Sequence, residues 1–198
     1  KTPHLVLQNL LFMKYGTLLF LLLALSLHGQ APLRQTIQLA ENWKFSKGNP
    51  AGAEAPDFDD SAWQTVRVPH DWAIAGPFDP AGSAETGKLP WQGEGWYRHT
   101  FRTDADWAGK RVYVLFDGVM AFPKVYLNGR LAGNWDYGYN SFFLEVTHLL
   151  RPGDNILAVH ADTRPHDSRW YPGAGMYRKV QLIATDPVHV GIWGTHIT

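Results

Sequence analysis

The sequence predicts an all-β domain, a jelly-roll β-sandwich, from three observations. Nine Trp, eight Tyr and ten Phe among 198 residues supply many rings of the kind that fill the interior between sheets. Nineteen Gly and thirteen Pro supply residues for chain reversals. Short segments with strand character recur along the chain without an amphipathic helix between them, which is typical of antiparallel sheets packed face to face.

Ten segments either alternate apolar and polar residues or are dense in aromatic and β-branched residues. They are residues 35–39, 43–45, 65–69, 95–101, 111–116, 124–127, 130–135, 142–146, 156–162 and 177–183. Asn128-Gly129 lies between two of them and predicts a tight hairpin, because both residues accept a positive φ. Residues 57–63 predict a brief helical turn, and residues 149–155 predict a turn. Residues 187–195 predict a further strand that has no following partner.

The charge balance and the residue types exclude several classes of function. Eighteen basic and eighteen acidic residues cancel, so we expect neither nucleic acid nor an anionic membrane surface as a partner. The absence of cysteine excludes disulfides, Cys-ligated zinc and thiol catalysis in this chain. The histidines are scattered without HxH or HExxH spacing, so we expect no metal site. A neutral partner fits this composition better than a charged one.

The amino-terminal region predicts export. Met13-Lys14-Tyr15 precedes an apolar run over residues 18–27, and small and polar residues follow it. This order is typical of a secretory signal peptide of about Met13 to Gly29, and the run is too short to span a bilayer. We therefore expect a periplasmic or secreted protein that keeps no membrane contact after cleavage near Gly29 or Gln30. An uncleaved anchor or a buried core helix is the alternative.

One aromatic and glycine-rich stretch, residues 168–180, has the composition of a sugar-binding loop. Trp170 and Tyr171 offer planar faces, Arg169 offers a fork of hydrogen-bond donors, and Asp167 adds a carboxylate. The apolar C–H faces of a pyranose stack on aromatic rings, while its hydroxyls need convergent polar partners. Alternatively, the two rings cap the end of the sandwich core.

A second long loop predicts the other wall of such a site. Residues 75–94 are rich in Gly and Pro and show no periodicity, and loops of this length are more often functional than idle. Trp91 lies within this loop and Asp71 lies just before it, so both are candidates for contact with a sugar. Asp71 has a second interpretation, in which its carboxylate braces the loop by accepting backbone N–H bonds.

No residue of this chain is assigned a catalytic role. A glycosidase normally needs two carboxylates about 5 to 10 Å apart. The acids near predicted loops are Asp71, Glu85, Glu94, Asp136, Asp162 and Asp167. Nothing in their spacing singles out a pair, and isolated acids in such loops are mostly turn formers or surface charges.

Six motifs follow one another along the chain in a recognisable order. They are Pro69-His70-Asp71-Trp72, Gly95-Trp96-Tyr97-Arg98, Phe116-Asp117-Gly118-Val119, Val125-Tyr126-Leu127-Asn128-Gly129, Gly138-Tyr139-Asn140-Ser141-Phe142 and residues 168–180. In this order they resemble the amino-terminal sugar-binding domain of glycoside hydrolase family 2, especially its secreted β-galactosidases from Bacteroidetes. The resemblance covers about residues 35–198.

The resemblance implies a galactose-binding-like jelly roll that is followed, in the full enzyme, by an immunoglobulin-like sandwich and a TIM barrel. In the family the nucleophile and the acid/base glutamate belong to the barrel, and hydrolysis retains the anomeric configuration. Neither signature of the barrel occurs in this sequence, so the chain alone is expected to lack turnover and to need no cofactor. The family's sugar-contacting loops match residues 87–94 and 167–171, with the galactose-contacting aspartate at Asp167 or displaced by a gap to Ser168.

These expectations divide the chain into three parts. Residues 1–30 are upstream residues and the signal peptide, residues 31–186 the sugar-binding domain, and residues 187–198 a linker and the first strand of an immunoglobulin-like domain. The expected partners are the terminal hexose of a galactoside and the catalytic barrel of the same chain. The alternative, from a different class, is a free-standing secreted carbohydrate-binding module without hydrolase activity.

Overall fold

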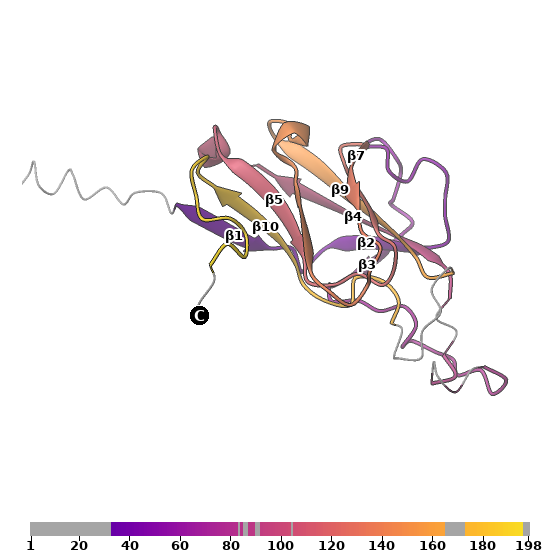
Figure 1. Ribbon diagram of the computed structural model, residues 1–198. Helices are drawn as coiled ribbons and strands as arrows, with labels where there is room; N and C mark the ends of the chain where they lie inside the picture. Colours follow the sequence, from indigo (N-terminus) through magenta and orange to yellow (C-terminus); the bar gives the residue numbers. More distant parts are fainter. Residues whose placement is uncertain are drawn as a thin grey trace, which may run out of the picture. The chain divides into compact units, whose positions relative to one another are not determined.

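The part of the chain that the structure describes forms two antiparallel sheets, and the prediction of a jelly-roll β-sandwich is confirmed (Figure 1). The computed structural model describes residues 33–82, 84, 87–89, 92–103, 105–164 and 173–195. All named strands belong to the compact unit that begins at Arg34. No helix in these described ranges is long and apolar enough to cross a membrane.

Each of the ten predicted segments overlaps one observed strand. The strands are β1 (Arg34–Gln38), β2 (Trp43–Lys47), β3 (Gln64–Val66), β4 (Glu94–Arg102), β5 (Arg111–Phe116), β6 (Lys124–Leu127), β7 (Arg130–Asn134), β8 (Phe142–Glu145), β9 (Asp154–Asp162) and β10 (Val180–Thr185). Two short 3-10 helices, η2 (Ala105–Trp107) and η3 (Thr147–Leu149), lie between strands. The four-stranded sheet has the order β1-β10-β5-β8, and the six-stranded sheet has the order β3-β2-β4-β9-β6-β7.

The core lies between the two sheets, and the alternation of side chains along each strand decides which residues enter it. In β5, Val112 and Val114 belong to the main apolar cluster, whereas Tyr113 belongs to a smaller cluster on the outer face. In β9, Val159 faces the core and Ala158 packs on the outer side. Figure 1 shows β1, β10 and β5 side by side in one sheet, and β9, β4 and β2 in the other.

The hairpin predicted at Asn128-Gly129 is confirmed, since it joins β6 to β7 with φ of 53° and 81° at its two central residues. The Asn128 side chain does more than permit the turn. Its Nδ2 donates to the carbonyl of Leu149 at 2.9 Å and to Oδ1 of Asn155 at 2.8 Å, and its Oδ1 accepts from the amide of Ile156 at 3.1 Å. The buried amide therefore ties the turn to the start of β9.

The helical turn predicted for residues 57–63 is wrong, because the structure has only turns and irregular chain there. The backbone carbonyls of Ala53 and Ala55 accept hydrogen bonds from the guanidinium of Arg98 at 2.5 and 2.9 Å. Asp60, expected near the start of a helix, instead binds Nε of Arg98 at 2.8 Å. A buried cation of β4 thus binds this segment and the residues before it, while within residues 57–63 the amide of Trp63 donates to the carbonyl of Asp60 at 3.0 Å in a turn that does not continue as a helix.

Two predictions near the carboxyl end also differ from the structure. The last strand begins at Val180 rather than at Tyr177, whose amide donates to the carbonyl of Gly175 in a tight turn. The strand predicted in residues 187–195 is absent from these described residues, which form turns and irregular chain. Ile192 packs against the outer cluster of the four-stranded sheet, so its apolar side chain is partly buried without strand pairing. The turn predicted at residues 149–155 starts at the last residue of η3 and ends at the start of β9.

Candidate functional site

The predicted sugar-binding loops leave the sandwich at one end, where β3 precedes residues 67–93 and β9 is followed by residues 163–179. Among the predicted contacts, the structure describes Asp71. The other five lie outside the described residues, and they are Trp91, Asp167, Arg169, Trp170 and Tyr171. The site is therefore built from the described residues from which these loops start.

The carboxylate of Asp71 joins two segments that are far apart in the sequence. Its Oδ1 accepts hydrogen bonds from the backbone amides of Ala73 at 2.8 Å and Ala174 at 3.1 Å. Burial raises the pKa of Asp71, and the two backbone donors oppose that rise by favouring the carboxylate. This geometry corresponds to the bracing role considered for Asp71, because one side chain holds the start of one loop against the end of the other.

The segments on either side of this brace pair along their backbones. The amide of His70 donates to the carbonyl of Met176 at 2.8 Å, and the amide of Trp72 donates to that of Ala174 at 3.0 Å. Between them, Gly175 has φ of 107°, and a Cβ there would overlap the hydroxyl of Tyr97. Glycine is required here because the backbone conformation and the close approach both exclude a side chain.

The hydroxyl of Tyr97 completes the inner side of this region. It lies 2.8 Å from Nδ1 of His70, and the ring of Phe45 packs 4.7 Å from the rings of both Tyr97 and His70. Burial lowers the pKa of His70, so its imidazole is held in the neutral form beside the phenol. Phe45, His70 and Tyr97 therefore form a packed aromatic layer beneath the loop end.

A second polar cluster fixes the points where both predicted loops meet the six-stranded sheet. Glu94 and Asp162 are opposite each other in the register of β4 and β9. The guanidinium of Arg164 lies 2.7 Å from Oε1 of Glu94 and makes two hydrogen bonds to Asp162, at 3.0 and 2.9 Å. Next to them, the amide of Gly93 donates to the hydroxyl oxygen of Thr163 at 2.7 Å, and the amide of Thr163 donates to the carbonyl of Gly93 at 2.8 Å. The arginine lowers the pKa of Asp162.

The same cluster includes a buried histidine. His160 packs on the indole of Trp96 with 4.9 Å between ring centres, and its Nε2 lies 3.4 Å from Glu94 without hydrogen-bond geometry. Burial lowers the pKa of His160, while the carboxylates of Glu94 and Asp162 partly offset this effect. Sequence reasoning did not find the partnership of Glu94 with Arg164 and His160, because only the strand register brings these residues together.

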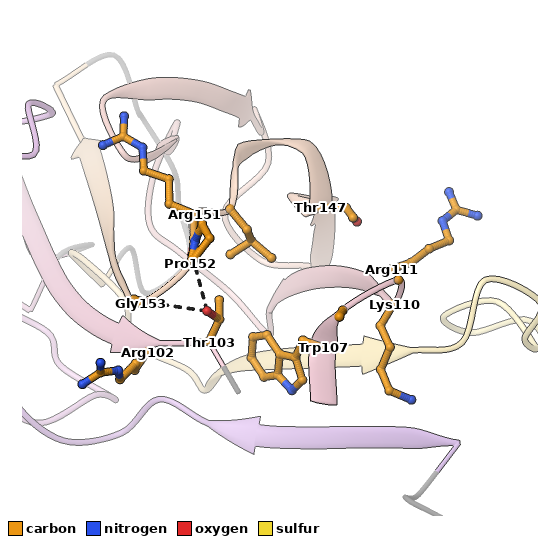
Figure 2. Close-up of a pocket in the computed structure, with 12 residues that line it drawn as sticks. Arg102, Thr103, Trp107, Lys110, Arg111, Thr147, Arg151, Pro152 and Gly153 are labelled. Atoms are coloured by element: carbon orange, nitrogen blue, oxygen red, sulfur yellow. Dashed lines mark hydrogen bonds between the residues drawn. The ribbon is translucent and has the colours of Figure 1, made fainter. Parts of the chain in front are cut away.

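A cavity of about 730 Å³ lies at the opposite end of the sandwich (Figure 2). Figure 2 shows Trp107 between Arg102 and Thr103 on one side and Lys110 on the other, with Thr103 bonded to the carbonyl of Gly153. Lys110 is paired with Asp186 at 2.8 Å, which reduces its attraction for an anion. Arg102, which lines the cavity, and Glu94 are the two ends of β4. They are about 26 Å apart along the strand, since each strand residue advances about 3.3 Å.

Comparison with known proteins decides the family. Residues 37–186 match the family model described as "Glycosyl hydrolases family 2, sugar binding domain". The chain belongs to this family. The match includes Asp71, the Glu94–Arg164 cluster and all strands from β2 to β9, so the site described above lies within the family 2 domain.

The family 2 domain is similar to parts of much longer enzymes. Beta-galactosidase BoGH2A of Bacteroides ovatus is 42% identical over 169 residues, which are 83% of this chain and 20% of that protein. A putative beta-glucuronidase of Formosa agariphila is 35% identical over 150 residues, which are 75% of this chain and 14% of that protein. The crystal structure of a beta-glycosidase from Bacteroides vulgatus matches with a TM-score of 0.75 and 36% identity, covering 79% of this chain and 21% of that one.

Proposed function

We propose that this domain supplies substrate-binding loops, without catalytic glutamates, to a retaining glycoside hydrolase of the β-galactosidase type. The observation that carries the proposal is the loop end of a family 2 sugar-binding domain, where the carboxylate of Asp71 joins the two loop bases by hydrogen bonds. Three of the loop acids that the structure describes, Asp71, Glu94 and Asp162, already bind internal donors, which supports a structural rather than a catalytic role for them. The proposed partners are the terminal hexose of a galactoside and a catalytic barrel of the same chain.

A neutral galactoside is favoured over a glucuronide as the ligand. Relatives named beta-galactosidase and beta-glucuronidase both occur, and the 42% identical relative is named a beta-galactosidase. A uronate carboxylate needs a cation with free donors. Arg164, at the base of the predicted loop, is shared between Glu94 and Asp162, so this arginine offers no free donor pair to a uronate. No cofactor or metal ion takes part in this proposal.

Export belongs to the same proposal. The expected signal peptide, about Met13 to Gly29, would deliver the enzyme to the periplasm or to the medium, where oligosaccharides and polysaccharides are encountered. Expression of the full gene in its host, followed by amino-terminal sequencing of the mature protein, tests this step. A mature chain that begins near Gly29 or Gln30 supports export, and one that retains residues 13–28 contradicts it.

Hydrolysis and binding measurements on the chain test the main proposal. We expect no release of nitrophenol from a nitrophenyl β-galactoside, because the reacting glutamates belong to the barrel. Calorimetric titration with galactose should give a Kd weaker than about 10 mM, since a few hydroxyl contacts barely offset the lost translational freedom. Turnover by the chain alone would contradict the division of labour between the two domains.

The free-standing carbohydrate-binding module remains the second candidate, and the same titration separates it from the first. A complete binding site should hold a galactoside with a Kd in the micromolar range, about a thousandfold tighter than half of a composite site. The DNA that follows the codon for Thr198 gives an independent answer. A reading frame that encodes a barrel with two glutamates supports the first candidate, and a stop codon supports the second.

A further inference from the structure

Three aromatic rings form a stack that runs from the core to the surface beside β8. Phe116 is fully buried, and its ring lies 4.9 Å from that of Phe142 with an angle of 13° between the planes. Trp135 is also stacked on Phe142, at 5.5 Å and 8°. The exposed fraction rises from 0% at Phe116 and 2% at Phe142 to 37% at Trp135. The indole is therefore the accessible end of a stack whose other members are fixed in the core.

The plane of the indole is held in place before any ligand arrives. Nε1 of Trp135 donates to Oδ1 of Asn140 at 2.8 Å, and the amide of Trp135 donates to the carbonyl of Pro123 at 3.1 Å. The loop that carries these residues is anchored at Gly138, whose carbonyl accepts from the hydroxyl of Tyr177 at 3.0 Å. A ring oriented in this way loses little conformational freedom when a ligand binds.

The surface around the indole mixes rings with neutral polar groups. Tyr137 is 58% exposed, and its ring lies 5.6 Å from that of Tyr139. Residues 134–141 themselves contain one anion, Asp136, and no cation, while Lys124 lies opposite Asn134 in the strand register and Arg178 lies beside Tyr177. An indole that only sealed the end of the core would not need an exposed tyrosine, Tyr137, next to it. The combination of flat apolar faces with phenol and amide groups suits a polyol that carries no charge.

We propose that Trp135, Tyr137, Tyr139 and Asn140, here named the Trp135 platform, bind a neutral β-linked oligosaccharide chain. The C–H face of a pyranose would stack on the indole, and the phenol and amide groups would bond to its hydroxyls. This site is additional to the Asp71 loop end and does not depend on the proposed function. The two regions lie at the same end of the sandwich, because Met120, which lies against Gly138, pairs by backbone with Gly175.

The test follows the side-chain N–H resonance of Trp135 in nitrogen-15 NMR spectra of the chain, assigned with the Trp135→Phe variant. We expect titration with β-1,4-galactotetraose or with cellotetraose to shift this resonance and to saturate with a Kd in the millimolar range. Tyr137→Ala should weaken binding by about tenfold, as expected when one aromatic contact is lost. Asn140→Leu should weaken sugar binding less than Tyr137→Ala does. The variant keeps the aromatic rings and removes the hydrogen bond that orients the indole of Trp135.

Matched variants keep the result interpretable. Trp193→Phe replaces another exposed indole, which lies edge-on to Phe143, and it should leave the shift of the Trp135 resonance unchanged. Asp71→Asn removes the brace of the loop end and should also leave the shift of the Trp135 resonance on adding sugar unchanged. Loss of the loop site can therefore be distinguished from loss of the Trp135 platform. No shift with either sugar up to about 20 mM overturns the proposal. A shift that appears on concentrating the protein without sugar also overturns it, since the platform would then bind a second copy.

Discussion

At the scale of single residues, Arg98 is the side chain that departs most from its ordinary environment. It is 1% exposed, although arginine is rarely buried without partners. Its partners are the carboxylate of Asp60, the carbonyls of Ala53 and Ala55, and the ring of Phe58 at 5.4 Å. The segment that covers the outer face of the six-stranded sheet is therefore held by this guanidinium, by the hydrogen bond from Nε1 of Trp96 to Asn49 and by the apolar cluster that includes Ala53.

Replacement of Arg98 by alanine should lower the free energy of unfolding by about 3 kcal/mol, because the buried carbonyls and Asp60 lose their donors together. Urea unfolding followed by tryptophan fluorescence measures this change. Arg102→Ala is the matched control from the same strand. Its side chain is exposed and 4.0 Å from Asp154, so it should cost less than about 0.5 kcal/mol. Equal losses in the two variants would show that the buried contacts of Arg98 contribute nothing.

At the scale of elements, the turn between β6 and β7 shows how one residue serves two purposes. Asn128 adopts the left-handed conformation that the hairpin needs, and its side chain also bonds to Leu149, Asn155 and Ile156. The sequence indicated the first purpose from the Asn-Gly pair. The second depends on the position of β9, which is not encoded within the hairpin.

Two substitutions of Asn128 separate these purposes. Asn128→Gly keeps the conformation and removes three hydrogen bonds, and it should destabilise the fold by about 2 kcal/mol. Asn128→Ala removes the same bonds and adds backbone strain, so it should cost about 1 kcal/mol more. Urea unfolding of both variants gives the difference. If alanine is tolerated as well as glycine, the turn does not require a positive φ at this position.

At the scale of the whole molecule, the two ends of the sandwich differ in what they hold. One end carries the Asp71 brace, the Glu94–Arg164 cluster and the Trp135 platform, while the other end carries the cavity near Trp107. Among the histidines that the structure describes, His160 is buried, and His70 and His99 are half-buried. Burial lowers the pKa of His70, His99 and His160 alike.

These histidines predict how stability depends on pH. Because their pKa values are lower in the folded state than in the unfolded state, the unfolded chain binds more protons below about pH 6.5. Stability should therefore fall as the pH is lowered from 7 to 5, and the raised pKa of Asp71 acts in the opposite direction to the histidines. Urea midpoints at pH 5, 6 and 7 measure the slope.

His99 is the histidine with which to test this attribution. Its ring stacks on Trp43 at 4.9 Å, so phenylalanine can take its place with little loss of packing. His99→Phe should reduce the fall in stability between pH 7 and pH 5. His148→Gln, at an exposed position in η3, should leave the fall unchanged. An unaltered pH dependence in His99→Phe would assign the effect to other groups.

The sequence by itself determined the strands, the Asn128-Gly129 turn and the family, because alternation and turn chemistry act over a few neighbouring residues. It also indicated Asp71 as either a sugar contact or a brace, and the structure shows the hydrogen bonds of a brace. The roles of Trp91, Asp167, Arg169, Trp170 and Tyr171 in sugar binding stay predictions.

Only the tertiary structure decided which distant residues meet. The pairing of β4 with β9 places Glu94 beside Asp162, and the approach of β7 to β8 places Trp135 on Phe142. Arg98 of β4 likewise meets Asp60 and the carbonyls of Ala53 and Ala55, which are far from it in the sequence. The physical reason is the same in each case. Register and packing between segments depend on contacts that neither segment contains, so local periodicity cannot specify them.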